Sequence, residues 1–461
     1  MKKACAFDSV LRGILVISLS VFTASSAEPE WKAGVTQAVI TPEGSYWMGG
    51  YASRKQPSEG TDLDLRAKAL ALEGAEGNRL VIVTLDLLVV TPKMADAILA
   101  GAKKRFGLEP AEVLINCSHT HCGPELRLYR ETLHNIPKPY AVKMRAYVDE
   151  LNEQLLDLMG KALDDLKPAY LTQSESSADF AINRRNNKGA EIEERRAAGT
   201  LQGPVDHAVP VLHVVDADKR EMAIVFGYAC HNTTMGFFKT SGDYAGYAQK
   251  FVEERHPGVV SMFIMGAGGD QNPSPRREEK HLAMHGRALA DAVEKALAGK
   301  QTEVSSKLRV ARKDAHLDFQ PHADRAALEE QTQSKNQYQR WKANYVLGQL
   351  DKGEAVPNTC DLPVQAARLG DQILLVAIGG ESVVDYSLRF KKEFGASNPM
   401  LWFAGYSMDV SFYLPSLRVL REGGYEGGGH MVYTHFPGPF AENVEERTFK
   451  AMRSVLNQVL E

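Results

Sequence analysis

Short apolar runs alternate with amphipathic stretches through most of this 461-residue chain. Residues 78–90 form one apolar run, and residues 92–107, which follow closely, have the composition of a helix. Residues 146–167 repeat apolar side chains at three- and four-residue spacing, as an amphipathic helix requires. Chains that alternate in this way bury a sheet between helices. The pattern predicts an α/β fold, a single large domain with a mixed sheet core and flanking helices.

The alternation continues to the end of the chain. Further strands are expected within residues 111–121, 209–217, 221–235, 259–273 and the first part of 372–395, and further helices over 244–258, 278–298, the last part of 372–395, and 442–460. A long polar helix over residues 323–350 is expected to leave the core. No internal repeat or Pro/Ser-rich linker divides the sequence, so we expect one domain over residues 28–461.

Composition and charge argue against nucleic acid as a partner. Hydrophobic residues make up 44% of the chain and charged residues 24%, as in ordinary globular proteins. The formal net charge is −4, and neither a basic stripe nor an acidic tail is present. A nucleic-acid-binding domain needs clustered Lys and Arg. We therefore expect no nucleic-acid partner.

The N-terminus has the pattern of a secretory signal. Two lysines and an arginine precede the apolar run GILVISLSVF, and small residues stand at Ser25 and Ala27. The run is too short to span a bilayer as an anchor. We expect a signal peptide over residues 1–27 and an exported protein, periplasmic or secreted. A buried N-terminal helix is the alternative.

Polar side chains stand where the expected strands end. His119, His231, Asp270 and Glu381 each follow an apolar run, at the start of a loop. Open α/β sheets bind ligands beyond the carboxyl ends of their strands. Four such ends that carry His, His, Asp and Glu predict an active site at the strand ends.

The segment Ile115–Glu125 reads INCSHTHCGPE, with two histidines separated by one threonine. A zinc site, a disulfide-braced turn and a chance cluster are all consistent with it. On an extended segment His119 and His121 would point to opposite faces, so they share one ion only if the strand has already turned. One could hold a metal while the other handles protons or substrate. His231 and Glu381 are the natural further ligands, because a hydrolytic zinc site uses nitrogen and oxygen donors.

Six motifs resemble, in the same order, those of a known family. They are HTHCGP, NRR, the pair ACHNTTM and SGDYAGYAQ, GAGGDQNPSP, GGESVVDY, and FYLPSLRVLREGGYEGG. Each is similar to a segment of the catalytic domain of neutral, non-lysosomal ceramidases, and the matches extend over residues 31–425. The resemblance implies a zinc-dependent amidohydrolase that cleaves an N-acyl amide of ceramide type.

Carried over residue by residue, the resemblance implies a set of metal ligands. These would hold Zn²⁺ and are His119, His231, Glu381 and Tyr413. Tyrosine is an unusual zinc ligand. From spacing alone, Tyr413 would be interpreted as an aromatic residue of a core strand.

The resemblance also implies roles in binding and proton transfer. Arg184 would contact the substrate head group or the surroundings of the scissile amide, and Tyr425 would donate a hydrogen bond to the developing oxyanion. His121 would orient or shuttle protons. Asp270 would brace the glycine-rich turn or act as a base. The alternatives are a solvated arginine and a plain turn aspartate. Asp243 also matches the family, but a helix N-cap explains it.

Two features depart from the family. Asn272 occupies the position of the family's serine nucleophile, and asparagine cannot form an acyl-enzyme. Ser274, two residues further on, is not assumed to replace that serine. We therefore expect attack by zinc-activated water, with Asn272 hydrogen-bonded to the substrate. The family continues into a C-terminal β-sandwich domain, which we expect to be absent, so lipid engagement would depend on apolar loops.

Three cysteines lie beside the expected ligand histidines, namely Cys117, Cys122 and Cys230. Thiolates are strong zinc ligands, and a Cys117–Cys122 disulfide is compatible with an oxidising compartment. The family has serine at the position of Cys122, which favours small buried side chains as the interpretation.

Three functions are consistent with the sequence. The first is an exported zinc-dependent hydrolase acting on an N-acyl amide, with a small-molecule or lipid-like substrate and peripheral contact with membrane lipid. The second keeps the zinc scaffold but acts on an ester or a carbohydrate-derived substrate, which polar turn residues such as Arg185 and Gln271 would suit. The third is a binding protein that has lost the chemistry. The sequence carries no signal for an oligomeric state.

Overall fold

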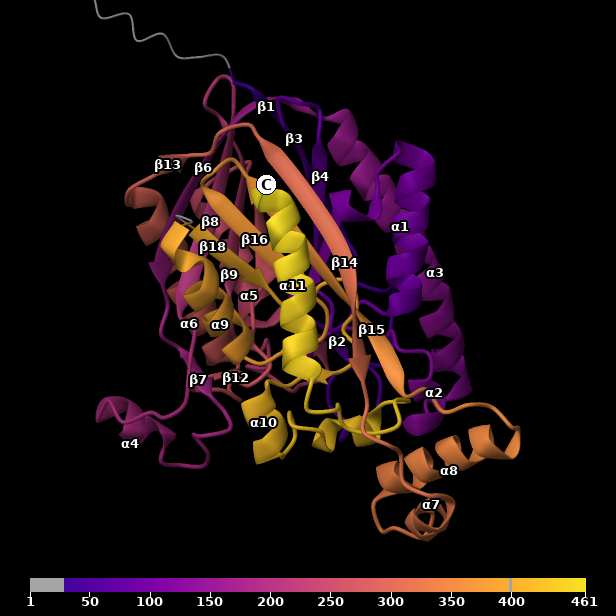
Figure 1. Cartoon of the computed structure of the whole chain (residues 1–461). Coiled ribbons are helices and arrows are strands. Elements are labelled where there is room, and N and C mark those ends of the chain that lie inside the picture. Colours follow the sequence, from indigo (N-terminus) through magenta and orange to yellow (C-terminus); the bar gives the residue numbers. More distant parts are fainter. Residues whose placement is uncertain (1–28, 398–399) are drawn as a thin grey trace, which may run out of the picture.

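The core consists of two β-sheets packed face to face, with helices on both outer faces (Figure 1). This computed structural model describes residues 29–397 and 400–461. One buried apolar cluster fills the space between the sheets, and another lies between each sheet and its helices. The expected α/β fold with a mixed sheet and flanking helices is confirmed, although the sequence did not indicate the second sheet. The expected signal peptide, residues 1–27, lies outside the described residues.

The larger sheet is mixed. Its strands follow the order β11, β9, β8, β6, β1, β3, β4, β5, with β13 beside β6. The pairs β9–β11 and β4–β5 are parallel, and the other neighbours are antiparallel. The strands are β1 (Trp31–Val39), β3 (Arg66–Glu73), β4 (Arg79–Leu85), β5 (Val113–Cys117), β6 (Lys167–Ser177), β8 (Ala208–Asp216), β9 (Glu221–Tyr228), β11 (Val260–Met265) and β13 (Thr302–Glu303).

The two edge strands of the larger sheet, β5 and β11, meet at their C-terminal ends. The fully buried side chain of Asn116 on β5 accepts a hydrogen bond from the backbone N–H of Met265 on β11 (2.8 Å). It also donates to the carbonyl oxygen of Gly405 (2.7 Å), just beyond the smaller sheet. Strand twist accumulates across a wide sheet, which lets distant strands approach each other. The loops that follow β5, β9 and β11 therefore gather in one place.

The smaller sheet has the order β14, β15, β16, β18. Helices α9 and α11 cover the face that points away from the larger sheet (Figure 1). The elements are β14 (Leu308–Asp318), β15 (Thr359–Leu369), β16 (Ile373–Ile378), α9 (Asp385–Phe394), β18 (Met400–Ala404) and α11 (Val444–Leu460).

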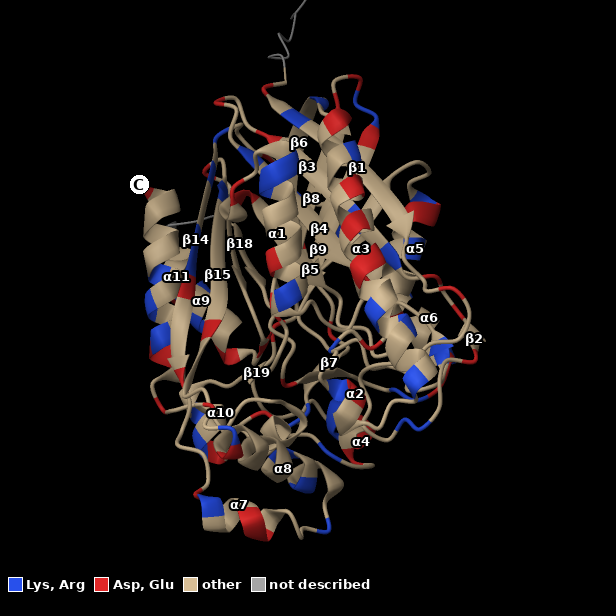
Figure 2. Cartoon of the chain, turned by 90° about the vertical axis from the view of Figure 1, so that its right-hand side faces the viewer, with Lys and Arg blue, Asp and Glu red and all other residues tan. Residues whose placement is uncertain are grey.

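Four helices cover the outer face of the larger sheet: α1 (Pro92–Phe106), α3 (Lys138–Asp164), α5 (Asp243–Arg255) and α6 (Lys280–Ala298). Charged residues recur along α1 and α3 (Figure 2), whereas the buried residues of these two helices are all apolar. No helix in the described part of the chain combines the length and the apolar character needed to cross a membrane. Short elements complete the chain: β2 (Gly60–Thr61), α2 (Arg130–Leu133), β7 (Ala181–Asn183), α4 (Ile192–Ala197), β10 (Lys239–Thr240), β12 (Gln271–Pro273), β17 (Glu381–Ser382), β19 (Tyr413–Leu414) and α10 (Leu417–Glu422).

The single helix expected over residues 323–350 is wrong. The segment forms two helices, α7 (Arg325–Gln331) and α8 (Gln337–Asp351), which project from the body of the molecule (Figure 1). Asn336 ends the break, because its side chain accepts a hydrogen bond from the backbone N–H of Tyr338 and caps α8. Polar residues with strong capping preference interrupt a helix in this way.

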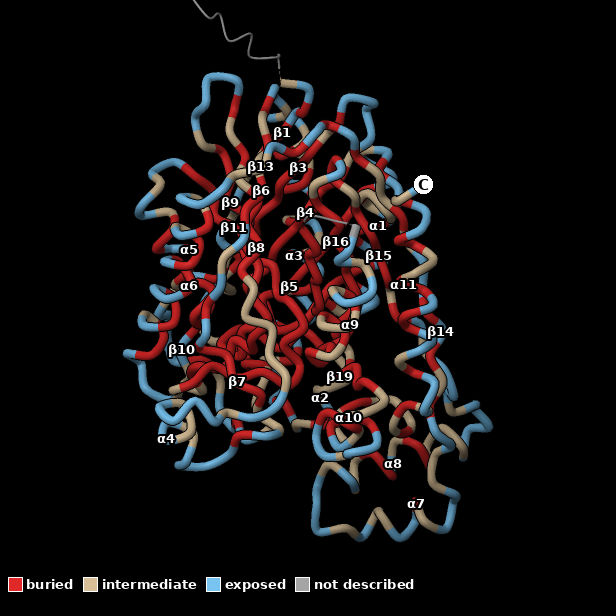
Figure 3. Tube along the Cα trace, turned by 60° about the vertical axis from the view of Figure 1, so that its left-hand side comes forward, coloured by how far each residue is buried: buried red, intermediate tan, exposed pale blue. Residues whose placement is uncertain are grey.

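Several apolar runs end as strands earlier than expected and continue as buried loops. Strand β4 ends at Leu85 within the expected 78–90, and β11 ends at Met265 within 259–273. The loop residues that follow stay buried, as Figure 3 shows for the region around β7. Apolar composition therefore reflected burial here, not strand length.

We predict that Asn116→Ala lowers the free energy of unfolding by about 2–3 kcal/mol, because the substitution leaves the buried N–H of Met265 without a partner. Urea denaturation followed by intrinsic fluorescence measures the change. Asn344→Ala, at an exposed position of α8, is the matched control and should shift stability by less than about 0.5 kcal/mol. Equal effects of the two substitutions would contradict the assignment.

Candidate metal centre

Four buried side chains converge where the loops gather. Nε2 of His119 lies 3.1 Å from Oε2 of Glu381, and Nε2 of His231 lies 3.2 Å from the same oxygen. The hydroxyl oxygen of Tyr413 lies 3.1 Å from Nε2 of His231. The structure thus brings together all four residues that the sequence predicted as metal ligands.

The chain turns immediately after β5, which decides where the two neighbouring histidines point. His119 has φ of 62°, in the left-handed region that non-glycine residues rarely adopt. As a result, its ring centroid lies 4.9 Å from that of His121. The strand has therefore already turned at His119, which is the condition under which His119 and His121 could share one ion.

Glu381 and Tyr413 are aligned by a small parallel pair of strands. Strand β17 pairs with β19 so that these two residues are direct neighbours in the register. The glycine-rich turn after β11 packs against β17: the backbone N–H of Gly269 donates to the carbonyl oxygen of Ser382 (2.8 Å). A Cβ atom at Gly269 would lie 2.6 Å from the carbonyl oxygen of Glu381. Glycine is therefore required for this close approach.

Backbone carbonyls fix the tautomers of two histidines. Nδ1 of His119 lies 2.6 Å from the carbonyl oxygen of Leu88, and Nδ1 of His231 lies 2.5 Å from that of Gly268. Each Nδ1 must carry the hydrogen and donate it, so in the neutral ring Nε2 is the nitrogen with the lone pair, and both Nε2 atoms face the carboxylate of Glu381. Burial lowers the pKa of His231 to about 4, which keeps its ring neutral at neutral pH. Lone pairs that face one another in this way fit a cation, and the outer hydrogen bonds match those of metal-binding histidines.

His121 differs from the other two histidines. Its Nε2 lies 3.1 Å from Nε2 of His119, but its Nδ1 is buried and has no hydrogen-bond partner among the described residues. The ligand nitrogens of His119, His121 and His231 all lie within 4.8 Å of one another, so the three could hold one ion. No backbone carbonyl holds Nδ1 of His121, in contrast to the other two histidines.

The centre opens into a cavity of about 230 Å³. Tyr425 lies in its wall with its side chain partly exposed, and its ring centroid lies 5.2 Å from that of Tyr413. Helix α8 supports the same wall, because Lys342 donates to the carbonyl oxygens of Met431 and Thr434 (3.4 and 2.9 Å). The projecting helices thus connect with the edge of the site.

Sequence reasoning missed a buried ion pair in the cavity wall. Arg127 binds Glu125 through two hydrogen bonds, Nε to Oε1 (2.7 Å) and Nη2 to Oε2 (2.8 Å). Burial would raise the pKa of Glu125, but the charge and hydrogen bonds of Arg127 outweigh burial and hold it at about 2. The signal was available, since GPELR follows the histidine motif directly.

Arg184 and Asn272 lie beside the centre. The guanidinium carbon of Arg184 lies 5.4 Å from the ring centroid of Tyr413, and its Nε donates to Oε1 of Glu426 (2.7 Å). Oδ1 of Asn272 accepts weak hydrogen bonds, both 3.4 Å, from Nη1 of Arg184 and from the hydroxyl of Thr233. Arg184 is therefore a partly buried, ion-paired residue and not a solvated one.

Asp270 and Asp243 hold loops together. Asp270 is fully buried and accepts hydrogen bonds from the side chain of Asn183 (2.9 Å) and the backbone N–H of Val384 (2.9 Å). Its carboxylate braces the turn, one of the two roles expected. Asp243 is the first residue of α5 and not its N-cap, which is Gly242. The cap lies one residue earlier than expected, at Gly242, but the Asp243 carboxylate does accept from the backbone N–H of Tyr244 in this helix, and also from those of residues 234–235.

The cysteines beside the histidines are free and buried: Cys117, Cys122 and Cys230. Burial raises the pKa of the Cys117 and Cys122 thiols to about 12, so both stay protonated at neutral pH. The packing interpretation is confirmed, and the disulfide alternative is not.

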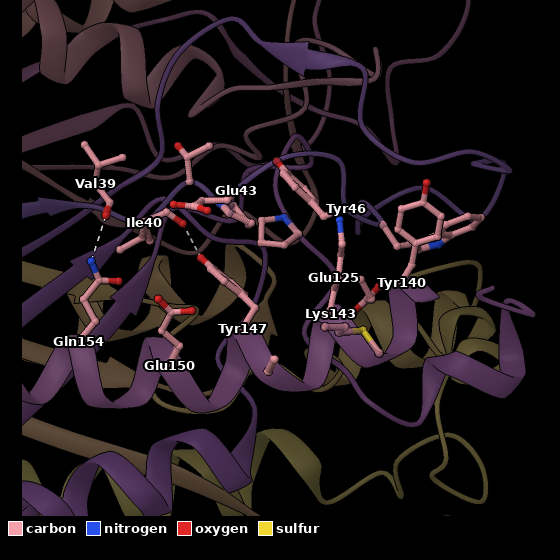
Figure 4. A pocket seen from close by; sticks show the side chains of 16 residues that line it. Val39, Ile40, Glu43, Tyr46, Glu125, Tyr140, Lys143, Tyr147, Glu150 and Gln154 are labelled. Atoms are coloured by element: carbon pink, nitrogen blue, oxygen red, sulfur yellow. Dashed lines mark hydrogen bonds between the residues drawn. The ribbon is translucent and has the colours of Figure 1, made fainter. Parts of the chain in front are cut away.

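A larger cavity, of about 460 Å³, lies between α3 and residues 39–47 (Figure 4). Its polar groups hold the adjoining loop: the hydroxyl of Tyr147 donates to the carbonyl oxygen of Ile40 (2.5 Å), and Gln154 donates to that of Val39 (3.1 Å). The residues that line it include none of the predicted site residues. Cavity size alone therefore does not locate the site.

Sequence comparison matches the N-terminal part of the chain to a known protein family. A family model described as neutral/alkaline non-lysosomal ceramidase, N-terminal, matches residues 31–279, more than half of the chain. Neutral ceramidase A of Dictyostelium discoideum is 28% identical over 253 residues, which cover 50% of this chain and 34% of that protein. Neutral ceramidase 2 of Arabidopsis thaliana is 27% identical over 237 residues, covering 48% and 30%. The chain thus spans about a third of the length of these curated relatives.

Structure comparison extends the likeness beyond that range. Neutral ceramidase from Pseudomonas aeruginosa superposes with a TM-score of 0.71 at 18% identity, covering 94% of this chain and 74% of that chain. A ceramidase complexed with C2 gives a TM-score of 0.70 at 18% identity, with coverage of 93% and 75%. At this identity, the match shows a shared fold for nearly the whole chain.

We predict that Glu125→Gln lowers the free energy of unfolding by about 3 kcal/mol near neutral pH, because Arg127 is left buried without its partner. The pKa of Glu125 falls from 4.5 to about 2 on folding, so its contribution is complete above pH 4.5 and is lost as the pH falls through 2. The difference between wild type and variant should therefore shrink between about pH 5 and pH 2.

Denaturation at stepped pH measures this difference. Glu109→Gln, which breaks an exposed pair with Lys103, is the control and should cost less than about 1 kcal/mol at every pH. A difference for Glu125→Gln that does not change with pH would contradict the depressed pKa.

Proposed function

This chain belongs to the neutral/alkaline non-lysosomal ceramidase family, and from that membership we propose that it is an exported zinc-dependent hydrolase of N-acyl amides. The observation that carries the proposal is the convergence of His119, His231, Glu381 and Tyr413 with their lone pairs directed inward. The substrate proposed is small or lipid-like and resembles ceramide. Its site is reached through the cavity beside Tyr425.

Zinc suits this donor set better than other common divalent ions. Imidazole nitrogens and carboxylate oxygens are donors that zinc uses, whereas Mg²⁺ and Ca²⁺ prefer oxygen alone. Tyr413 would bind as the phenolate, although burial raises the pKa of its free phenol well above the ordinary value. When bound, zinc polarises a carbonyl group and lowers the pKa of water to near neutrality.

The surrounding residues would position the amide and move its protons. Arg184, beside Tyr413, orients the polar part of the substrate. Tyr425, in the cavity wall, donates a hydrogen bond to the carbonyl oxygen as negative charge develops on it. His121, whose Nδ1 no backbone carbonyl holds, takes a proton from the attacking water and returns one to the departing amine.

Hydrolysis would proceed without a covalent intermediate. Asn272 stands where the family carries its serine nucleophile, and its amide cannot attack a carbonyl. Its Oδ1 is already close to Arg184 and Thr233, so it would orient Arg184 and the substrate. Ser274 is bonded to Glu193 (3.0 Å) and is no substitute. Water supplies the oxygen to the acyl carbon, the C–N bond breaks, and the amine leaves with the proton.

A second candidate function keeps the same centre and changes the substrate. The cavity of about 230 Å³ is small beside the 300–1,000 Å³ usual for ligand sites, and arginine, histidine and tyrosine side chains line much of it. These features favour a compact polar ester or a carbohydrate-derived substrate. A binding protein without turnover is the third candidate. Fatty-acid release from N-acyl amides identifies the first candidate, turnover of an ester or a carbohydrate-derived substrate the second, and ligand binding without turnover the third.

We further propose that residues 1–27 are a cleaved signal peptide and that residues 28–461 form the mature domain. The basic and apolar segments described above support this, followed by small residues at Ser25 and Ala27. Peripheral contact with membrane lipid would bring a lipid substrate to the cavity.

We predict about one zinc ion per chain in the purified protein, and loss of most of it in His231→Ala and Glu381→Ala. His121→Ala should keep the metal, since we assign His121 to proton transfer. Metal content by mass spectrometry measures all three variants. A protein that stays metal-free after zinc is offered would contradict the hydrolase mechanism.

We predict that Tyr425→Phe lowers kcat for N-acyl amide hydrolysis about a hundredfold, because a hydrogen bond to the developing oxyanion is lost. Zinc content should not change. Tyr345→Phe, on α8 and away from the cavity, is the matched control and should keep wild-type kcat.

We predict that Asn272→Ala keeps measurable turnover, with kcat reduced about tenfold, because a positioning contact is removed and no nucleophile is lost. Hydroxylamine should trap no acyl-enzyme in either protein. A trapped acyl-enzyme in the wild type would contradict attack by water.

A further inference from the structure

A third cavity, of about 420 Å³, lies next to the metal centre, between the β7–β12 pair and the segment that leads into α4. It shares Arg184 and Asn272 with the surroundings of that centre. Its polar lining is mostly cationic or amide in character: Arg184, Asn187, Lys188, Glu193, Asn272, Ser274 and Arg276. A ligand in this cavity would therefore lie within reach of the reacting bond.

Arg276 has no carboxylate partner in the described part of the chain. Its one side-chain hydrogen bond is weak, from Nη1 to the hydroxyl of Thr233 (3.4 Å). Burial, followed by the nearby charges of Arg277 and Arg184, lowers the pKa of Arg276. A partly buried guanidinium surrounded by like charges lacks the anion that usually compensates such a group.

Arg184, which also lines this cavity, keeps an unused hydrogen-bond donor. Its Nε is satisfied by Glu426 and its Nη1 by Asn272, but its Nη2 is buried with no hydrogen-bond partner among the described residues. Guanidinium groups with free N–H donors are the usual partners of phosphate, sulfate and carboxylate oxygens.

The acidic residue of the lining does not neutralise these charges. Oε1 of Glu193 accepts a hydrogen bond from the hydroxyl of Ser274 (3.0 Å). No ion pair between Glu193 and Arg276 or Lys188 lies within the described ranges 29–397 and 400–461. Arg196 adds a further positive charge nearby, with its side chain bonded only to backbone carbonyl oxygens, including that of Ser274. The cavity therefore carries a net positive charge.

We propose that this cavity binds an oxyanion group of the substrate, such as a phosphate, through Arg276, Lys188 and the free Nη2 of Arg184. The proposal rests on the proposed function in one respect, that the scissile amide lies at the metal centre. It makes the preferred substrate an N-acyl compound with an anionic group on its amine side. It also explains why polar residues crowd one side of the centre.

Inorganic phosphate is the first probe, because its binding needs no turnover. Isothermal titration calorimetry on the full chain should show one phosphate site, weakened at least about tenfold by Arg276→Gln. Arg287→Gln removes the same charge from an exposed position of α6 and should leave binding unchanged. Lys188→Gln, at an exposed position, should weaken binding about threefold and guards against a folding defect in Arg276→Gln.

Two outcomes of the titration would overturn the proposal. One is phosphate binding that is absent or equal in Arg276→Gln and Arg287→Gln. The other is Arg276-dependent binding that disappears when a chelator removes metal, because the anion would then sit on the metal. Binding that persists after chelation supports a separate cavity.

Turnover tests the substrate class. The probes are a ceramide and the same ceramide phosphorylated at its primary hydroxyl. The ratio of kcat/KM, phosphorylated over neutral, should fall at least about tenfold in Arg276→Gln and stay unchanged in Arg287→Gln. An unchanged ratio in both variants would overturn the assignment of the anion to the substrate. If neither lipid is hydrolysed but Arg276-dependent phosphate binding persists, the anion site stands and the proposed reaction fails.

Discussion

The structure is organised around two imidazole nitrogens that face one buried carboxylate oxygen. Two backbone carbonyls hold the Nδ1 hydrogens of His119 and His231, so both Nε2 atoms point at the carboxylate of Glu381. In a buried site such an arrangement costs free energy unless a cation lies at its centre. The hydroxyl of Tyr413 completes the set, 3.1 Å from Nε2 of His231. A divalent metal is the simplest way to satisfy all four groups.

The fold can hold these groups because the strands that precede them, although far apart in the sequence, end at the same place. The buried amide of Asn116 ties β5 to β11 and both to the smaller sheet, so the loops that carry the two histidines meet. The β17–β19 pair then brings Glu381 beside Tyr413, and Gly269 allows the turn after β11 to pack against β17. The family match ends at residue 279, whereas Glu381 and Tyr413 come from the second sheet's half of the chain. The centre therefore depends on both sheets.

Sequence patterns located the parts of this centre but not its assembly. The apolar runs that end at His119, His231 and Glu381 predicted a site at strand ends, because side chains at such ends are free of the core. Tyr413 came only from the family resemblance, since a lone tyrosine in an apolar stretch has no local signal. The second sheet was missed because β14 and β15 are half-exposed strands with mixed composition. The break at Asn336 was missed because the polar residues around it also suit a solvated helix.

The buried arginines around the metal centre differ in whether a carboxylate compensates their charge. On one side Arg127 is fully compensated by Glu125, and on the other Arg276 lacks any such partner in the described chain. The Arg127–Glu125 pair stabilises a wall, whereas Arg276 leaves an uncompensated charge in the neighbouring cavity. Polar groups that lack a partner, at the metal centre and at Arg276, distinguish a binding site from a cavity that is only large, such as the one beside α3.

The most direct test of the central claim is zinc K-edge X-ray absorption on the purified, zinc-loaded protein. With His119, His231, Glu381 and Tyr413 as ligands, we expect a first shell of nitrogen and oxygen at about 2.0–2.2 Å, with scattering from two imidazole rings and no sulfur. A sulfur shell near 2.3 Å would show that cysteine thiolates hold the metal, and three imidazoles would make His121 a ligand. Either result would contradict the assignment of the four ligands.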